Sequence, residues 1–280
     1  MRLNLRFVVR AFITFLAVLA FALTLLSFLP SPILRQWVLW AQAFNSPPLE
    51  ATPLPPLITA PRGEMPGEPI GLTEWAQFDG GAFEPRGSGF LLRLGSGEVV
   101  GVTTTHSVGD LRDAGDTLRQ LALGLPGQST STFIVQIDTL YGEPGVPRTS
   151  DDLTVDWLLL KVNPSQTIDP SLILTPDSRG APQPGERVSL FGGWGKVGVF
   201  EGTVQSVDTN GIWVLMDETF DAGGMSGSPL ISQHTGQVVG MAIAVDYGRN
   251  RVRVGFNPIG VLVQKAEAAT QFPKINQYTR

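Results

Sequence analysis

Residues 224–230 read Gly224-Met225-Ser226-Gly227-Ser228-Pro229-Leu230, a glycine-rich turn that leads into a short apolar run. Glycine allows backbone dihedral angles that other residues rarely adopt, so such a turn can expose the Ser226 hydroxyl while aiming backbone N–H groups at one point. The same pattern occurs in ordinary hairpin connections. It also departs from the nucleophile elbow Gly-x-Ser-x-Gly, because Ser228 takes the last position. The stretch marks Ser226 as a candidate nucleophile and disfavours an α/β-hydrolase.

Two further polar residues stand where β-rich segments end or begin. His106 follows the run 99–105, and Asp156 precedes the strongly hydrophobic run 157–162. Taken singly, each is more often a turn or surface residue. Together with Ser226 they supply what serine hydrolysis needs: a hydroxyl, an imidazole that takes its proton, and a carboxylate that fixes the tautomer of the imidazole. The chain order His, Asp, Ser is that of chymotrypsin, whereas subtilisin-like enzymes run Asp, His, Ser.

The segments around these residues predict an all-β domain. From residue 70 onward, short β-rich runs alternate with Gly, Pro, Asn and Asp. The expected strands lie at residues 90–94, 98–104, 132–140, 157–162, 187–191, 199–207, 212–216, 237–245 and 252–256. Residues 95–97 and 234–236 are typical of hairpin connections, and residues 259–270 predict a closing helix.

Several of these motifs resemble the trypsin-like peptidase superfamily, and in particular its cysteine-free bacterial branches, the HtrA-type and glutamyl-endopeptidase-type proteases. The resemblance covers roughly residues 87–269 and rests on Gly87-Ser88-Gly89-Phe90, Thr104-Thr105-His106, Asp156-Trp157-Leu158-Leu159-Leu160-Lys161, the turn 224–229 and Val254-Gly255-Phe256-Asn257-Pro258. It implies two six-stranded antiparallel β-barrels with the active site in the cleft between them. It also implies that His106, Asp156 and Ser226 form a catalytic triad. Only about 20 residues follow Pro258, so no PDZ module is expected.

The chain departs from the family pattern in and around the turn. Met225 stands where digestive members carry an aspartate that pairs with a newly cut N-terminus, so that form of zymogen activation is expected to be absent. Ser228 replaces the usual second glycine, as in glutamyl endopeptidases. By the same resemblance, the backbone N–H groups of Gly224 and Ser226 would form the oxyanion hole.

The resemblance also assigns a substrate pocket. Phe220, six residues before the nucleophile, would form its base, and Ile243, Ala244 and Val245 would narrow one wall. No carboxylate at Phe220 could pair with a substrate Arg or Lys, and burying such a cation unpaired is costly. We therefore expect Ala or Val, rather than Phe, just before the cut. Asp221 leaves an alternative open, because an inward carboxylate would restore a preference for basic residues.

The N-terminal part predicts a membrane anchor. Residues 11–29 form an apolar run close to the ~20 residues that a spanning helix needs. Arginines precede the run and no acid appears before Glu50, so the positive-inside rule leaves the N-terminus in the cytoplasm and the rest outside. The alternative is a signal peptide, with cleavage at Ala41-Gln42-Ala43 followed by secretion.

A juxtamembrane segment and a spacer follow the anchor. Apolar residues recur at helical spacing in residues 32–44, which favours a short helix, either at the membrane surface or packed on the protease domain. Residues 45–69 contain eight prolines, a composition typical of an extended linker. The expected organisation is an anchor at 1–31, a juxtamembrane segment and linker at 32–69, and a protease domain at 70–280.

Composition limits the other possibilities. The chain has 25 acidic and 20 basic residues and no basic cluster beyond its N-terminus, so nucleic acid is not an expected partner. It has no cysteine, which excludes disulfides, thiolate metal sites and a cysteine nucleophile. Its histidines, His106 and His234, are far apart in sequence, so we assign no metal. His234 lies in a polar hairpin tip, is expected to be solvated, and receives no role.

The expected function is that of a membrane-anchored, extracytoplasmic serine endopeptidase. Its substrates would be proteins or peptides, and its mechanism would use an acyl-enzyme and no cofactor. The alternative is a catalytically silent protease-like domain that binds peptides or an envelope partner. The sequence leaves the oligomeric state open.

Overall fold

The computed structural model describes residues 31–49, 63–109, 117–128 and 132–277. The chain divides into two compact units, residues 1–47 and 48–280. The first contains helix α2 (Ser31–Asn45), which confirms the helix expected at 32–44. The expected anchor at 11–29 lies outside the described residues. Among the residues that are described, no helix is long and apolar enough to cross a membrane.

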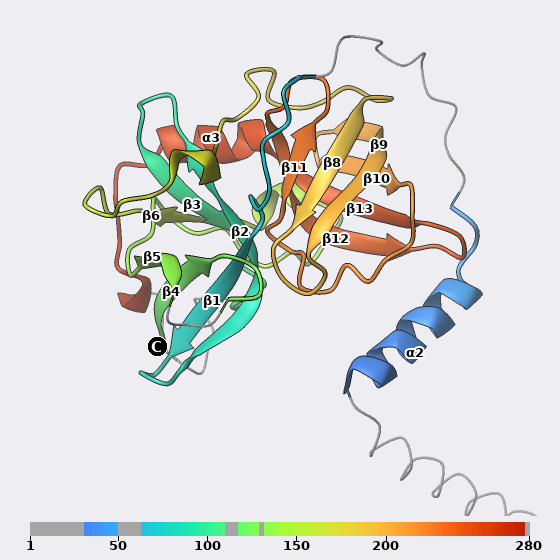
Figure 1. Ribbon diagram of the computed structural model, residues 1–280, viewed down its shortest axis with the longest axis horizontal. Helices are drawn as coiled ribbons and strands as arrows, with labels where there is room; N and C mark the ends of the chain where they lie inside the picture. Colours follow the sequence, from blue (N-terminus) through green and yellow to red (C-terminus); the bar gives the residue numbers. More distant parts are fainter. Residues whose placement is uncertain (1–30, 50–62, 110–116, 129–131, 278–280) are drawn as a thin grey trace, which may run out of the picture. The chain divides into compact units, whose positions relative to one another are not determined.

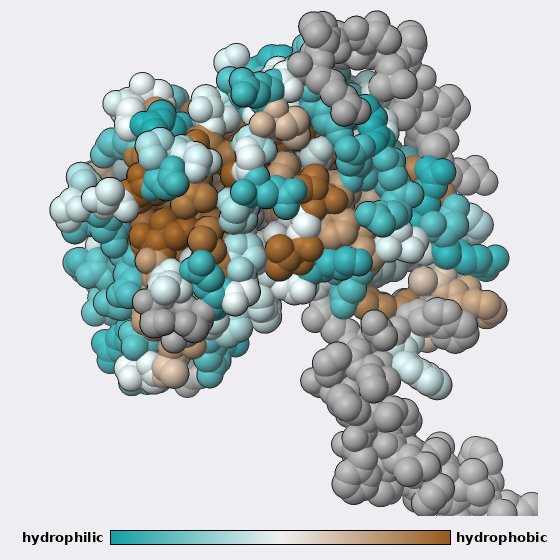
Figure 2. All heavy atoms as spheres, in the orientation of Figure 1, coloured by the Kyte–Doolittle hydropathy of each residue, from teal (hydrophilic) through white to brown (hydrophobic). Residues whose placement is uncertain are grey.

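The second unit begins with a seven-stranded sheet (Figure 1). Its strands are β1 (Leu72–Phe78), β2 (Phe83–Arg93), β3 (Val99–Thr103), β4 (Leu118–Gly124), β5 (Phe133–Ile137), β6 (Leu158–Lys161) and β7 (Ile173–Leu174). The order is β5-β4-β1-β2-β3-β6, and β7 pairs with β2 in parallel. Alternate apolar side chains, such as Leu121, Leu123 and Leu160, fill its core. Figure 2 shows apolar surface gathered over this half of the domain.

The first sheet corrects the expectation of two six-stranded barrels. β5 ends at Ile137, and its continuation meets β6 only through an isolated bridge between Leu140 and Leu160. Beyond Gly142 the N–H groups of Gly145 and Val146 donate to the carbonyls of Trp157 and Val155, each at 2.9 Å, but residues 142–152 form no strand, so the ladder that would close a regular barrel is not extended. This half of the domain is a half-barrel.

The second sheet closes into a six-stranded barrel. Its strands are β8 (Arg187–Gly192), β9 (Gly198–Asp208), β10 (Gly211–Met216), β11 (Pro229–Ser232), β12 (Val238–Tyr247) and β13 (Val252–Pro258), in the order β10-β13-β12-β11-β8-β9. Among the described residues, the short 3₁₀ helices η1 (Leu153–Val155) and η2 (Pro170–Leu172) lie in connections between strands, and η3 (Ile275–Gln277) lies near the C-terminus. The architecture is an all-β, chymotrypsin-like fold with few helices.

Helix α3 (Ile259–Glu267) follows β13 and helps to join the two halves. It buries Ile259, Leu262 and Ala266 in an apolar cluster that also contains Phe90 from β2 and Ile231 from β11. The shared core fixes the end of β3 and the turn before β11 relative to one another, because packed interiors deform little. These are the two places where the sequence put the candidate base and nucleophile.

Candidate active site

The structure brings His106, Asp156 and Ser226 together from three connections. His106 lies in the turn after β3, Asp156 between η1 and β6, and Ser226 in the turn before β11. Nδ1 of His106 is 2.7 Å from Oδ2 of Asp156, and Nε2 of His106 is 2.7 Å from Oγ of Ser226. With Nδ1–H donating to the carboxylate, Nε2 is left to accept the serine proton.

Asp156 is fully buried, and its oxygens are saturated with donors. Oδ1 accepts the backbone N–H groups of Thr105 at 2.8 Å and His106 at 3.2 Å, and Oδ2 accepts that of Arg148 at 3.1 Å beside the imidazole. These hydrogen bonds compensate the carboxylate oxygens for their burial and fix the orientation of the side chain. The His106 side chain is 34% exposed, so the ring faces outward from a buried anion. Thr105 adds a bond from its hydroxyl to the Trp157 carbonyl at 2.9 Å, which ties the histidine turn to β6.

The turn around Ser226 requires glycine at two positions. Gly224 and Gly227 have φ of 86° and 91°. A Cβ on Gly227 would lie 1.9 Å from the Ser88 carbonyl oxygen, so no larger residue fits. Within the turn, the Met225 N–H donates to the Ala222 carbonyl at 3.1 Å.

The backbone N–H groups of Gly224 and Ser226 are the candidate oxyanion donors. In the part of the chain that the structure describes, the N–H groups of Gly224 and Ser226 make no hydrogen bond. The Gly223 carbonyl packs directly against Gly195, because a Cβ added to Gly195 would lie 1.9 Å from the Gly223 carbonyl oxygen. A trans peptide points its N–H opposite to its carbonyl, so the Gly224 N–H is directed away from Gly195. Neither N–H group is thus engaged by the described part of the chain.

A small cavity of about 40 Å³ lies beside Ser226. The predicted wall residues Ile243, Ala244 and Val245 line it, together with Leu190, Ala222, Met225, Ala242 and Val254. Phe220 is not a lining residue. Its ring stacks on Phe200 with centroids 4.3 Å apart inside the second barrel. Counting back six residues assumes a fixed loop path, and here the 222–225 turn brings Ala222 to the cavity instead.

Asp221 also lies outside the lining of this cavity. Its carboxylate accepts the Gly223 N–H at 2.9 Å, and the neighbouring Tyr247 hydroxyl accepts the Ala222 N–H at 3.0 Å. These contacts hold the loop that precedes the turn. The alternative in which Asp221 turns inward is therefore not the arrangement in this structure.

Sequence reasoning missed one residue near the site, Glu74. It is fully buried on β1, and the Thr103 hydroxyl lies 2.9 Å from its Oε2. Burial raises the pKa of Glu74 to about 7. The sequence feature that could have pointed to Glu74 is an acidic residue within the largely apolar stretch 70–78.

The remaining candidates lie apart from the triad. His234 is in the connection between β11 and β12, where its N–H donates to Ser232 Oγ at 3.1 Å, and it is partly buried rather than fully solvated. No group of three His, Cys, Asp or Glu residues among the described positions is arranged to hold a metal.

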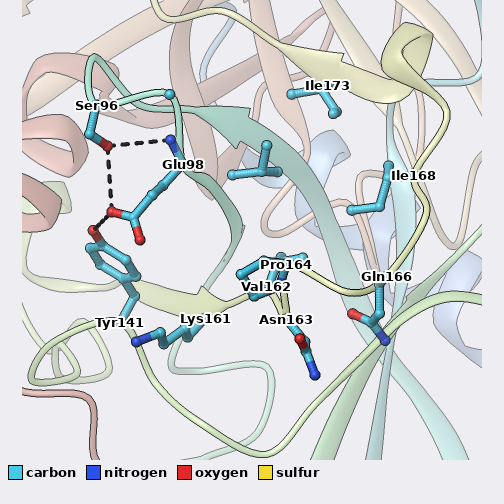
Figure 3. A pocket seen from close by; sticks show the side chains of 12 residues that line it. Ser96, Glu98, Tyr141, Lys161, Val162, Asn163, Pro164, Gln166, Ile168 and Ile173 are labelled. Atoms are coloured by element: carbon cyan, nitrogen blue, oxygen red, sulfur yellow. Dashed lines mark hydrogen bonds between the residues drawn. The ribbon is translucent and has the colours of Figure 1, made fainter.

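A larger cavity of about 480 Å³ lies on the first sheet (Figure 3). Its wall includes Glu98, whose carboxylate accepts the Tyr141 hydroxyl at 2.8 Å, and the apolar side chains of Val162, Ile168 and Ile173. It shares no lining residue with the triad. The chemistry is therefore assigned to the smaller cavity beside Ser226.

Comparisons with known proteins show the family and the fold of the chain. The family described as trypsin-like peptidase domain matches residues 87–241. The thermostable serine protease AL20 from an extremophilic microorganism is similar at 14% identity and a TM-score of 0.51, covering 72% of this chain and 98% of that one. Kallikrein-related peptidase 10 is similar at 16% identity and a TM-score of 0.50, covering 72% and 95%. At these identities the structural likeness concerns the fold. No curated protein matches the chain.

Proposed function

Because the chain belongs to the trypsin-like peptidase family and is a chymotrypsin-like serine endopeptidase, we propose that His106, Asp156 and Ser226 form its catalytic triad. The observation that carries this proposal is the pair of 2.7 Å contacts that link the three side chains through the two nitrogens of one imidazole. Substrates of the family are proteins or peptides.

In the proposed reaction, Ser226 Oγ attacks the scissile carbonyl carbon as its proton passes to Nε2 of His106. Asp156 stabilises the imidazolium that forms. Collapse of the tetrahedral intermediate breaks the C–N bond, and the leaving amine takes the proton from His106. Water then repeats the sequence on the acyl-enzyme and regenerates the Ser226 hydroxyl.

The N–H groups of Gly224 and Ser226 would stabilise the negative oxygen of both tetrahedral intermediates. In comparable sites, each preorganised donor of this kind lowers the activation barrier by about 3 kcal/mol. Their geometry depends on the positive φ of Gly224, so the backbone of the turn is part of the proposed machinery.

For specificity, we propose a small apolar side chain just before the cut. The cavity beside Ser226 holds about 40 Å³ and is lined almost entirely by aliphatic groups, without a charged side chain. Ala or Val fits such a space, whereas Phe does not. A Lys or Arg would lose its hydration without gaining a partner. The residues proposed to set this preference are Leu190, Ala222 and Val254, in addition to the wall 243–245.

We further propose that residues 11–29 anchor the protein in a membrane, with the protease domain outside the cytoplasm. The arginine-flanked apolar run supports this proposal. Fractionation of the full chain, followed by digestion of intact cells with an added protease, tests it. A soluble product with a new N-terminus near residues 42–44 would instead establish secretion after signal cleavage.

Labelling of the full chain with a fluorophosphonate probe tests the catalytic assignment. Wild type should be labelled, and Ser226→Ala should not. Ser228→Ala is the matched control, because it removes from the same turn a buried hydroxyl for which the described residues offer no hydrogen-bond partner, and it should retain labelling. A peptide-binding domain without catalysis would leave all three proteins unlabelled.

A further inference from the structure

Ser88 on β2 holds the turn that carries Ser226. The N–H of Ser88 donates to the Ser226 carbonyl at 2.8 Å. Its hydroxyl donates to the Gly224 carbonyl at 2.8 Å and accepts the Trp194 N–H at 2.9 Å. Ser88 therefore fixes the peptide groups before and after the Met225–Ser226 peptide, which carries the Ser226 N–H, one of the two proposed oxyanion donors.

The Ser88 carbonyl is held in turn by Thr103 on β3. Oγ1 of Thr103 lies 2.8 Å from the Ser88 carbonyl oxygen and 2.9 Å from Oε2 of Glu74. A hydroxyl has one proton and cannot donate fully to both acceptors. Both contacts are satisfied together when Glu74 is protonated and donates to Thr103, because the Thr103 proton then remains on Ser88.

The surroundings of Glu74 favour this neutral form. Glu74 is fully buried beside a β-bulge between Glu74 and Trp75, and its cross-strand neighbour on β4 is the apolar Leu123. Its second oxygen, Oε1, has no hydrogen-bond partner within the described residues. The hydroxyl of the nearby Ser107 donates to the Thr104 carbonyl at 2.7 Å, so it would have to give up that bond to serve Glu74. An ionised carboxylate would be poorly solvated here.

The charged groups that face Glu74 come from the neighbouring strands. Arg86 lies on β2, and His106 follows β3. Burial raises the pKa of Glu74 to about 7, although the Ser107 and Thr103 hydroxyls and the charges of His106 and Arg86 act in the opposite direction. The carboxyl can therefore exchange its proton in the neutral pH range.

Glu74 also lies directly behind the turn. A Cβ on Gly87 would be 2.9 Å from Oε2 of Glu74 and 3.2 Å from the Ser226 carbonyl oxygen, so only a glycine separates them. We propose that Glu74 is a positioning residue for the Ser226 turn: as a neutral acid it donates to Thr103, and so keeps the Thr103 proton on the Ser88 carbonyl. This inference rests on the proposed triad.

Loss of the Glu74 proton to solvent reverses the arrangement. The carboxylate becomes the stronger acceptor, and the Thr103 proton moves to it. The Ser88 carbonyl then loses its donor, and the strand segment that fixes Ser226 and Gly224 is held by one bond fewer. The structure thus links the protonation of Glu74 to the geometry of the proposed oxyanion hole.

Glu74→Gln is the informative substitution, since a neutral amide of the same shape donates to Thr103 at every pH. We would measure kcat, KM and the rate of fluorophosphonate labelling from about pH 5 to about pH 9 for wild type, Glu74→Gln and the exposed control Glu267→Gln. In all three proteins, kcat should rise with pH at the acidic end of the range, as expected for a histidine that acts as the base. Above neutral pH, kcat of wild type and of the control should fall about fivefold below that of Glu74→Gln, the effect of one hydrogen bond, with little change in KM.

Thr103→Val tests the path of the effect. Relative to wild type, it should lower kcat about fivefold below neutral pH, where the Thr103 hydroxyl still donates to the Ser88 carbonyl, and change it little above neutral pH, where wild type has already lost that bond. In the Thr103→Val background, Glu74→Gln should have no further effect on kcat. The inference would be overturned if kcat of wild type and of Glu74→Gln depended on pH in the same way. It would also be overturned if Glu74→Gln changed kcat equally with and without the Thr103 hydroxyl.

If wild type is not labelled at any pH, the proposed triad fails. Infrared difference spectra between about pH 6 and about pH 9 still decide whether Glu74 is protonated in that case. A protonated carboxyl band that appears in wild type and is missing from Glu74→Gln supports a neutral Glu74. A wild-type spectrum without such a band refutes it.

Discussion

Replacement of Glu74 by Gln should change how the stability of the domain depends on pH. The pKa of this carboxyl rises from an ordinary value of 4.5 to about 7 on folding, because burial disfavours the charged form. The difference between the two values is about 2.5, and each unit corresponds to 1.36 kcal/mol. The linked contribution to the free energy of unfolding is therefore about 3 kcal/mol at most.

The sign follows from which state loses its proton first. In the unfolded chain Glu74 ionises as pH rises through its ordinary pKa, whereas in the folded protein it stays protonated until about pH 7. The unfolded state is thus favoured progressively between about pH 4.5 and about pH 7, and the penalty is constant above this window. Gln does not ionise, so Glu74→Gln should gain up to about 3 kcal/mol relative to wild type across the same window.

Urea denaturation at several pH values from about 4.5 to about 8 measures this difference. The exposed control Glu267→Gln should follow wild type throughout. A constant offset between Glu74→Gln and wild type carries no information about titration, so only its change with pH is interpreted. An offset that does not grow with pH, or one that shrinks, would show that folding does not raise the pKa of Glu74.

Further expected outcomes concern the catalytic turn and the pocket. His106→Ala, Asp156→Asn and Ser226→Ala should each reduce hydrolysis at least about a thousandfold while preserving the circular dichroism spectrum, because a triad acts as a unit. Gly227→Ala should abolish both fluorophosphonate labelling and cooperative unfolding, since its Cβ would lie 1.9 Å from the Ser88 carbonyl oxygen. A peptide library should show cleavage after Ala or Val, and Leu190→Ala should extend it to Leu, whereas dominant cleavage after Arg or Lys would refute the pocket assignment.

Most strands could be predicted from the sequence because their apolar residues recur in short runs between turn formers. Each predicted run overlaps an observed strand, and the closing helix was also correct. The prediction missed β1 and β4 and the short strands β7 and β11. β1 reads Leu72-Thr73-Glu74-Trp75-Ala76-Gln77-Phe78 and buries Thr73 and Glu74 between β2 and β4. A buried polar residue breaks the alternation, and the partners that satisfy it come from other strands.

The site was predictable to the extent that it depends on residue type and order. The three triad candidates lie at or near strand ends, and the glycines of the turn indicate positive φ angles. Glu74 could not be placed in the same way, because its role depends on the register that sets Glu74 opposite Gly87. The pocket base was misplaced for a similar reason: the path of the loop 220–225, rather than residue count, decides which side chain reaches the cavity.

The structure also indicates how the turn is held without the ion pair of digestive relatives. Met225 takes the position of their aspartate, and its side chain is buried in the apolar core of the second barrel, where a charge could not be accommodated. The turn is instead fixed by uncharged groups, the Ser88 hydroxyl and N–H from the first sheet and the Tyr247 hydroxyl from β12. These groups need no newly formed N-terminus. Their strength depends on the hydrogen bonds behind Ser88, so under the role proposed for Glu74 its proton would set how firmly the turn is held.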